Sequence, residues 1–418
     1  MRLTYSPRPR RGASLAAGAV LLVSAWLGFA AGSEAAFPPG RNGQIAYSAG
    51  QEAVIAIADD GQNPSNLSST FGGMTDDPAY SPAGHQLLLA TNASGGQGQD
   101  IFLINDNGSD PVNLTAGAAG DDVQPSWSPD GKRIVFVRRA AGASSLYAMN
   151  ADGSALTSLT SGFDDSDPSF SPDGRLIVFT RTTSGDGNIF QINVDGSALG
   201  SLISGPNDES NPTFSPDQKQ LLFTRHDGGD DDILLQTPAA ASLVNLTAGR
   251  DAHDRDPVFS ADGKRIAFSS NSRGDFDVFT MGADGSSPLN VSSVSSLDDT
   301  DPDWQTQQFC SRQRATIVGS LGDDVITGTP RVDTIVTFDG RDRVSAKAGK
   351  DKVCAGPGAD TVKGGSGMDR LFGGKGKDRL FGGGEFDRLI GDGGRDLLVG
   401  AEFDRLAGGA GKDRIKRR

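Results

Sequence analysis

Aspartates recur at a regular spacing through the last quarter of this 418-residue chain. Successive steps are nine residues, with a single step of eight before the last two: Asp324, Asp333, Asp342, Asp351, Asp360, Asp369, Asp378, Asp387, Asp396, Asp404 and Asp413. Glycines precede many of them, and glycine lets the backbone take positive φ and bring carbonyl oxygens close together. Carboxylate and carbonyl oxygens are the ligands that Ca²⁺ prefers. The repeated aspartates are therefore candidate ligands of a hard cation such as Ca²⁺.

Short strands must position these aspartates, because an apolar residue stands two places after each one, from Ile326 to Ile415. The clearest copies, Gly364–Phe372 (GGSGMDRLF) and Gly373–Phe381 (GGKGKDRLF), resemble the G-G-x-G-x-D-x-U-x nonapeptide of RTX, or haemolysin-type, calcium-binding proteins. The resemblance implies a parallel β-roll with two nonapeptides per coil, so that loops 18 residues apart share Ca²⁺. The glycines it adds to the aspartate ligands are Gly364, Gly365, Gly367, Gly373, Gly374 and Gly376.

The nonapeptide pattern is imperfect. Repeats before Ala355 lack the paired glycines, Glu385 replaces a fourth-position glycine, and the repeat at Gly400 is one residue short. We expect weaker or empty sites there. The alternative is a glycine-rich solenoid that holds no metal.

Basic residues follow the aspartates in alternate repeats, at Lys352, Arg370, Arg388 and Arg405. On a two-sheet roll they stack on one outer face. This face is either a binding surface for an anionic polymer or for the acidic part of the same chain, or a solvated surface that discourages sheet aggregation.

A longer repeat fills the preceding part of the chain and is clearest in residues 121–137, DDVQPSWSPDGKRIVFV. Its prolines recur at intervals of 43 to 47 residues: Pro78, Pro125, Pro168, Pro212, Pro257 and Pro302. A period near 45 with short strands is typical of a propeller blade. One copy is split between residues 43–48 and 301–304, which predicts six blades and a ring closed by both ends of the array.

These segments resemble the TolB-type β-propeller family, because D-x-x-P-x-W-S-P-D-G-K-x-I-x-F and L-Y-x-M-N-x-D-G motifs recur across them. The resemblance implies a six-bladed propeller that acts as a binding platform in the bacterial envelope. It does not specify a partner.

A set of carboxylates three residues before the blade prolines is the candidate partner-binding site of the propeller: Asp122, Asp165, Glu209, Asp254 and Asp299. If the loops that carry them encircle one mouth of the channel, they attract cations or a basic peptide. Alternatively, each carboxylate caps a turn or strand end within its own blade.

The catalytic alternative is an enzyme built on propeller loops, either a polysaccharide lyase or a hydrolase. His85, His226 and His253 fall in different loop contexts, with no Ser/His/Asp spacing and no paired metal-binding histidines. The chain has no G-x-S-x-G nucleophile elbow of the kind found in α/β-hydrolases. The sequence therefore favours a non-catalytic protein that binds calcium and a protein or polymer partner.

The two repeats divide the chain into an all-β propeller over residues 37–309 and a β-roll over residues 310–418, and the two parts differ in charge. The first carries 14 Lys and Arg against 36 Asp and Glu, and the second 21 against 16. A net charge of −22 on the propeller repels phosphates and argues against nucleic acid as its partner.

Residues 1–36 resemble a secretory signal peptide, with Arg8, Arg10 and Arg11 before an uncharged run and small residues near Ala35. The alternative is an uncleaved membrane anchor. Either way we expect a secreted, extracellular or periplasmic protein. Its two cysteines, Cys310 and Cys354, either pair in that oxidising environment or remain free thiols.

Overall fold

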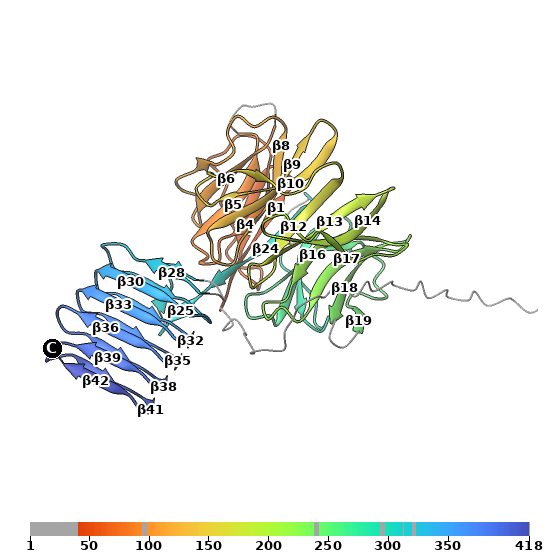
Figure 1. Ribbon diagram of the computed structural model, residues 1–418. Helices are drawn as coiled ribbons and strands as arrows, with labels where there is room; N and C mark the ends of the chain where they lie inside the picture. The colour runs from red at the N-terminus through yellow and green to blue at the C-terminus, as the bar shows by residue number, and fades with distance from the viewer. Residues whose placement is uncertain are drawn as a thin grey trace, which may run out of the picture.

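The computed structural model describes residues 41–93, 98–237, 242–292, 297–311, 313–319 and 323–417. Every regular element in this part is a β-strand, in a propeller followed by a solenoid whose strands stack like rungs toward the C-terminus (Figure 1). No helix in the described part is long and apolar enough to cross a membrane. The predicted signal segment, residues 1–36, lies outside the described residues.

The propeller has six four-stranded antiparallel sheets, numbered here as blades 1 to 6. Blade 1 is β24 (Asp299–Gln307), β1 (Arg41–Ala49), β2 (Ala53–Ile57) and β3 (Ser65–Asn66). Blade 2 is β4 (Thr75–Tyr80), β5 (Gln86–Thr91), β6 (Asp100–Asn105) and β7 (Val112–Asn113). Blade 3 is β8 (Asp121–Trp127), β9 (Arg133–Ala140), β10 (Ala143–Asn150) and β11 (Thr157–Ser158).

The remaining blades repeat this plan. Blade 4 is β12 (Asp164–Phe170), β13 (Leu176–Thr183), β14 (Asp186–Asn193) and β15 (Gly200–Ile203). Blade 5 is β16 (Asp208–Phe214), β17 (Leu221–His226), β18 (Asp231–Thr237) and β19 (Ser242–Asn245). Blade 6 is β20 (Asp254–Phe259), β21 (Arg265–Ser270), β22 (Asp277–Gly282) and β23 (Leu289–Asn290).

Blade 1 closes the ring as the split repeat predicts. Its innermost strand β24 comes from the end of the array and pairs antiparallel with β1 from the beginning, with Ile45 opposite Trp304. Pairing the two ends of the array removes a free sheet edge.

Aromatic side chains at one position of the second strand pack the blades against one another. Phe136, Phe179, Phe223 and Phe268 are each fully buried. Burying one such side chain contributes roughly 1.5–3 kcal/mol. This position repeats every 43 to 45 residues, in step with the prolines whose spacing predicts the blades.

The innermost strand of every blade bulges at its Asx/Gln-Pro step. The residue before each proline has positive φ, between 50° and 54°, at Asp77, Gln124, Asp167, Asn211, Asp256 and Asp301. The pairing register shifts at the same place, for example between Val123 and Ser126. Proline lacks an N–H and cannot complete the ladder there, which favours a bulge. The bulges turn these six side chains into the central channel.

The solenoid is a parallel β-roll with two six-stranded sheets. One contains β27 (Ile317–Val318), β29 (Thr334–Val336), β31 (Lys352–Cys354), β34 (Arg370–Phe372), β37 (Arg388–Ile390) and β40 (Arg405–Ala407). The other contains β28 (Val325–Thr327), β30 (Arg343–Ala348), β33 (Thr361–Ser366), β36 (Arg379–Gly383), β39 (Leu397–Gly400) and β42 (Arg414–Arg417). A narrow third ladder joins loops through β32 (Pro357–Gly358), β35 (Lys375–Gly376), β38 (Gly393–Gly394) and β41 (Ala410–Gly411).

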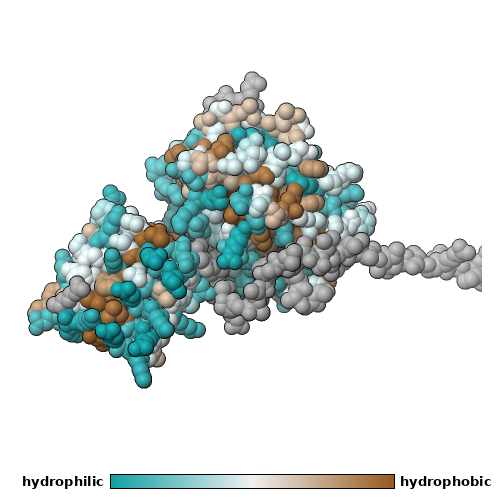
Figure 2. All heavy atoms as spheres, viewed as in Figure 1, coloured by the Kyte–Doolittle hydropathy of each residue, from teal (hydrophilic) through white to brown (hydrophobic). Residues whose placement is uncertain are grey.

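The core of the roll is one apolar cluster between its two sheets. The side chains two residues after the aspartates point inward, and those from Val353 to Leu398 are completely buried. On the face shown in Figure 2, hydrophilic side chains cover much of both parts, with apolar patches between them.

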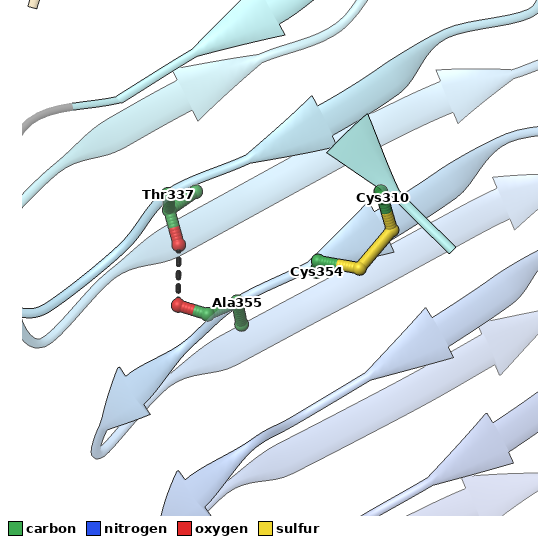
Figure 3. Close-up of a disulfide and its surroundings, with 4 residues drawn as sticks. All are labelled: Cys310, Thr337, Cys354 and Ala355. Carbon is green, nitrogen blue, oxygen red and sulfur yellow. Dashed lines mark hydrogen bonds between the residues drawn. A yellow bond between two sulfur atoms is a disulfide. The ribbon is translucent and has the colours of Figure 1, made fainter. Parts of the chain in front are cut away.

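A disulfide ties the segment after the propeller to the roll. The hairpin of β25 (Phe309–Cys310) and β26 (Gln313–Arg314) carries Cys310, which is bonded to Cys354 on β31 across a Cα–Cα distance of 5.6 Å (Figure 3). Beside it, the Thr337 hydroxyl donates to the Ala355 carbonyl one coil later at 2.7 Å. Of the two alternatives left open by the sequence, the cysteines therefore pair.

Candidate functional site

The aspartates of the nonapeptides form two columns along the roll. Column A contains Asp333, Asp351, Asp369, Asp387 and Asp404, and column B contains Asp324, Asp342, Asp360, Asp378, Asp396 and Asp413. Within each column the Oδ1 of one aspartate accepts a hydrogen bond from the backbone N–H of the aspartate one coil earlier, at 2.8–3.0 Å. The predicted 18-residue stacking is present, because Gly365 pairs with Gly383 and Gly376 with Gly394.

In the aspartates of the central coils, the second carboxylate oxygen has no protein partner. Oδ2 is buried without a hydrogen bond in Asp351, Asp360, Asp369, Asp378, Asp387 and Asp396. A buried carboxylate oxygen without a partner costs free energy, which is recovered if a cation binds it. Hard, anionic oxygens in two regular columns match the ligand preference of Ca²⁺.

The first glycine of each repeat leaves room for that oxygen. A Cβ added at Gly364 would lie 2.3 Å from Oδ2 of Asp369, and one at Gly391 would lie 2.4 Å from Oδ2 of Asp396. A side chain there would therefore displace the carboxylate.

The second and fourth glycines are needed for close stacking of the loops. Gly376 has φ of 142°, and a Cβ on it would lie 1.4 Å from the carbonyl oxygen of Gly358. Four departures from the pattern keep positive φ without glycine, at Phe338 (64°), Lys347 (77°), Glu385 (72°) and Asp392 (64°). The loops of the roll thus hold rows of carbonyl oxygens beside the aspartates.

Burial makes the aspartate columns electrostatically costly without a cation. Desolvation, with smaller contributions from neighbouring aspartates, raises the pKa of Asp360 to about 8, of Asp369 to about 7 and of Asp378 to about 6. It also raises the pKa of Asp396. Near neutral pH the raised pKa values of Asp360 and Asp369 favour retained protons, which a calcium ion would displace.

The columns are less uniform at their ends. At the first coil, Asp324 lies 3.5 Å from the Lys132 ammonium of the propeller. Both Asp333 oxygens accept from the Thr329 hydroxyl, at 3.2 and 3.0 Å. At the last coil Asp413 is only half-buried. The central coils have the arrangement best suited to calcium.

The propeller carboxylates predicted to bind a partner are buried rather than presented to solvent. Asp122, Asp165, Glu209, Asp254 and Asp299 are at most 1% exposed. The reason is local pairing with the second strand: Arg138 contacts Asp122 at 2.6 and 2.8 Å, and Arg181 contacts Asp165 at the same distances.

The other blades vary this pairing. Glu209 receives one hydrogen bond of 3.0 Å from Arg225, and Asp254 lies 3.3 Å from Arg250. Asp299 has no such arginine, and burial raises its pKa to about 7. This geometry supports the alternative reading, in which the carboxylates stabilise their own blades.

Six other residues surround the channel: Asp77, Gln124, Asp167, Asn211, Asp256 and Asp301. Gln124 joins two of them, since its Nε2 donates to Asp167 at 2.7 Å and its backbone N–H donates to Asp77 at 2.9 Å. Burial raises the pKa of Asp256 to about 7 and that of Asp77 well above its usual value. Sequence reasoning missed this ring, although each member directly precedes a blade proline.

Aromatic residues two positions after the prolines line a separate cavity of about 250 Å³ toward the other end of the same strands: Tyr80, Trp127, Phe170, Phe214, Phe259 and Trp304. Gln308 and Val318, from the segment after β24, line the same cavity. The channel therefore differs at its two ends, with polar side chains at one and aromatic rings at the other.

A family model described as the TolB beta propeller domain matches residues 38–248, half of the chain. The chain belongs to this family. A second family model, the RTX calcium-binding nonapeptide repeat, matches the roll that follows the propeller. Its four copies match residues 316–353, 355–389, 372–404 and 399–416. No curated protein matches the chain.

Solved structures similar to this TolB-family chain share its propeller. TolB from Acinetobacter baumannii is 21% identical, with a TM-score of 0.55, and the match covers 63% of this chain and 66% of that one. Kuenenia stuttgartiensis hydrazine synthase is 15% identical, with a TM-score of 0.56 and coverage of 67% and 48%. A chain of a nidogen/laminin complex is 11% identical, with a TM-score of 0.53 and coverage of 64% and 99%. These likenesses show the fold alone.

Proposed function

We propose that this protein is an exported, non-catalytic calcium-binding protein whose β-roll is ordered by Ca²⁺ and whose propeller binds a protein or polymer partner. The observation that carries the calcium proposal is the double column of buried aspartates, each with one oxygen used in stacking and, in the central coils, the other without a partner. Calcium, when bound, supplies the positive charge that these columns lack.

The residues proposed as ligands are the aspartates of columns A and B with the glycines around them: Gly364, Gly365, Gly367, Gly373, Gly374 and Gly376. The central aspartates Asp369, Asp378, Asp387 and Asp396 supply carboxylate oxygens, and the glycines let the backbone approach. The end sites should be weaker, since Lys132 lies beside Asp324 and Asp413 is partly exposed. Affinity should lie on the order of 10⁻⁴ to 10⁻³ M, as in extracellular calcium modules.

Two surfaces support the proposal of a partner. The channel ring of the propeller carries four aspartates, which suits a cationic group of the partner. The roll carries the opposite charge on one face, where Lys352, Arg370, Arg388 and Arg405 align in register along one sheet. A partner with both basic and acidic regions would fit the two parts of one chain.

Export is supported by the disulfide and by the calcium sites together. Disulfides persist in oxidising compartments, and weak calcium sites fill only where free calcium is high. The expected location is therefore outside the cytoplasm, in the periplasm or the medium.

Isothermal titration of the full chain with Ca²⁺, with Mg²⁺ as the matched control, tests the calcium proposal. We expect several equivalents of Ca²⁺ to bind and Mg²⁺ to bind much more weakly, because Mg²⁺ gives up its water shell reluctantly. Absence of calcium binding at millimolar concentration would contradict it.

A further inference from the structure

Two of the three histidines of this chain meet over one carboxylate at the junction of blades 5 and 6. His226 ends β17, Asp231 begins β18, and His253 directly precedes β20. The Nδ1 of His226 lies 2.8 Å from Oδ1 of Asp231, and the Nδ1 of His253 lies 3.1 Å from Oδ2. One ligand atom from each residue lies within 4.8 Å of the other two.

The chain departs from its own repeat to make this cluster. In four of the other five blades the position of His253 is an aspartate: Asp121, Asp164, Asp208 and Asp298; blade 2 has Met74 there. Each of these aspartates accepts a hydrogen bond from a backbone N–H at the start of the third strand of the preceding blade, donated by Gln99, Ser144, Gly187 and Phe276 respectively.

Asp231 occupies the donor position in blade 5. It stands two residues before Ile233, whose N–H donates to Thr247 as that of Ile101 donates to Thr115. At this junction His253 therefore stands where four other blades have the aspartate acceptor. Asp231 stands where those blades have the backbone N–H donor, and its carboxylate faces His253. Together these two substitutions place the side chains of His253 and Asp231 in contact, where the other blades have a bond from a backbone N–H to a carboxylate.

The chemistry of this set differs from that of the roll. Two imidazole nitrogens and one carboxylate oxygen suit Zn²⁺ and similar transition ions, whereas Ca²⁺ prefers oxygen alone. Two ligands of a tetrahedral ion at about 2.1 Å lie about 3.4 Å apart. The two N···O separations are 2.8 and 3.1 Å, and one ligand atom from each residue lies within 4.8 Å of the other two, so the set is close to this spacing without being at it.

We propose that His226, Asp231 and His253 bind one divalent transition-metal ion of the Zn²⁺ class. The side chains are 45%, 22% and 41% exposed, so an ion can enter from solvent and keep water in a fourth position. When the ion is bound through Nδ1 of His226 and His253, the proton of each neutral imidazole ring is on Nε2. Three further aspartates, Asp227, Asp230 and Asp232, adjoin the site in sequence and add negative charge that attracts a cation.

The test uses the full chain in saturating Ca²⁺, so that the roll is loaded. Zn²⁺ is titrated calorimetrically, Co²⁺ by visible absorption, and Cu²⁺ by electron paramagnetic resonance, in which nitrogen hyperfine splitting reports histidine ligands. We expect one equivalent of each ion to bind. His253→Asp introduces the residue that four other blades have at this position. This variant and His226→Asn should each weaken binding at least tenfold and remove nitrogen splitting from the lost ligand.

Asp164→Asn is the matched control, because it changes the position equivalent to His253 in a blade that carries no histidine there, and it should leave binding unchanged. Thermal unfolding shows which variants are folded. If His253→Asp is unfolded, His226→Asn at the half-exposed end of β17 decides. Equal binding by wild type and a folded histidine variant, or no binding by wild type, would overturn the proposal and leave the cluster as a hydrogen-bonded link between blades.

Discussion

The carboxylate of Asp396 accepts a 2.9 Å hydrogen bond from the backbone N–H of Asp378, one coil earlier, while its other oxygen is buried without a partner. The two oxygens of each central aspartate thus have different roles. Oδ1 links the coils without any ion, and Oδ2 is available for one. The two roles can be separated by mutation.

Asp378→Asn should weaken calcium binding while leaving the coil link in place. The amide keeps an oxygen that accepts from Asp360, but it replaces the second oxygen with a donor that calcium does not bind. We expect the calcium midpoint to rise by about three- to tenfold, or one equivalent to be lost, in a calorimetric titration. Glu402→Gln, at an exposed carboxylate outside both columns, is the control. An unchanged titration in the first variant would mean that Asp378 is not a ligand.

Calcium affinity should rise with pH between about 6 and 8. The folded-state pKa values of Asp360 (about 8), Asp369 (about 7) and Asp378 (about 6) lie above the ordinary value near 3.9. Because these pKa values are raised, the calcium-free roll is most stable at low pH, where both states are protonated, and it loses stability as pH rises through the folded pKa values.

Bound calcium displaces the retained protons, so binding should release protons over the same pH range. Calorimetry at pH 6 and pH 8, in buffers of different ionisation enthalpy, measures both quantities. Equal affinity at the two pH values and no proton release would show that these aspartates are not protonated in the calcium-free roll.

Replacing both cysteines by serine should destabilise the first coils of the roll. The disulfide between Cys310 and Cys354 closes a loop with a sequence separation of 44. The chain-entropy model gives about 4 kcal/mol for a loop of this size. Protease cleavage between residues 313 and 354 should become faster in the double variant, with wild type under reducing conditions behaving likewise. Unchanged cleavage would indicate that the roll docks without the bond.

Arg181→Leu should destabilise the propeller by about 3–5 kcal/mol, because it leaves the carboxylate of Asp165 buried and unpaired. The control is Lys219→Leu, whose partner Asp217 is exposed and whose ion pair should contribute less than about 1 kcal/mol. Urea unfolding followed by Trp fluorescence measures the difference. If the two variants are equally stable, the Asp165 pair does not stabilise the blade and its partner-binding interpretation regains support.

The two sequence periods predicted most of the fold because each repeat corresponds to one structural unit: a blade in the propeller and half a coil in the roll. Phe136 and its counterparts in other blades are buried where neighbouring blades pack together. The pairing of β1 with β24 follows from the two half-repeats at the ends of the array. In the roll, the spacing of nine places every aspartate and every inward Leu or Val, because two repeats make one coil.

The side-chain partners could not be predicted in the same way. Asp122 and Arg138, Asp165 and Arg181, and Glu209 and Arg225 are each 16 residues apart, a spacing visible in the sequence but meaningful only once the register of the first two strands is known. The His226–Asp231–His253 cluster depends on how neighbouring blades meet. A comparison of the repeats shows His253 in place of an aspartate, which is the signal that could have found it.

Hydrogen–deuterium exchange of the full chain, with and without calcium, tests most directly the claim that calcium orders the aspartate columns. In chelator, we expect amides of residues 355–417 to exchange rapidly, because the aspartates repel one another and the glycine-rich loops lose entropy on ordering. In saturating Ca²⁺ these amides should become protected, while those of propeller strands such as β9 and β13 remain unchanged. Equal protection of the roll in chelator and in calcium would contradict the account.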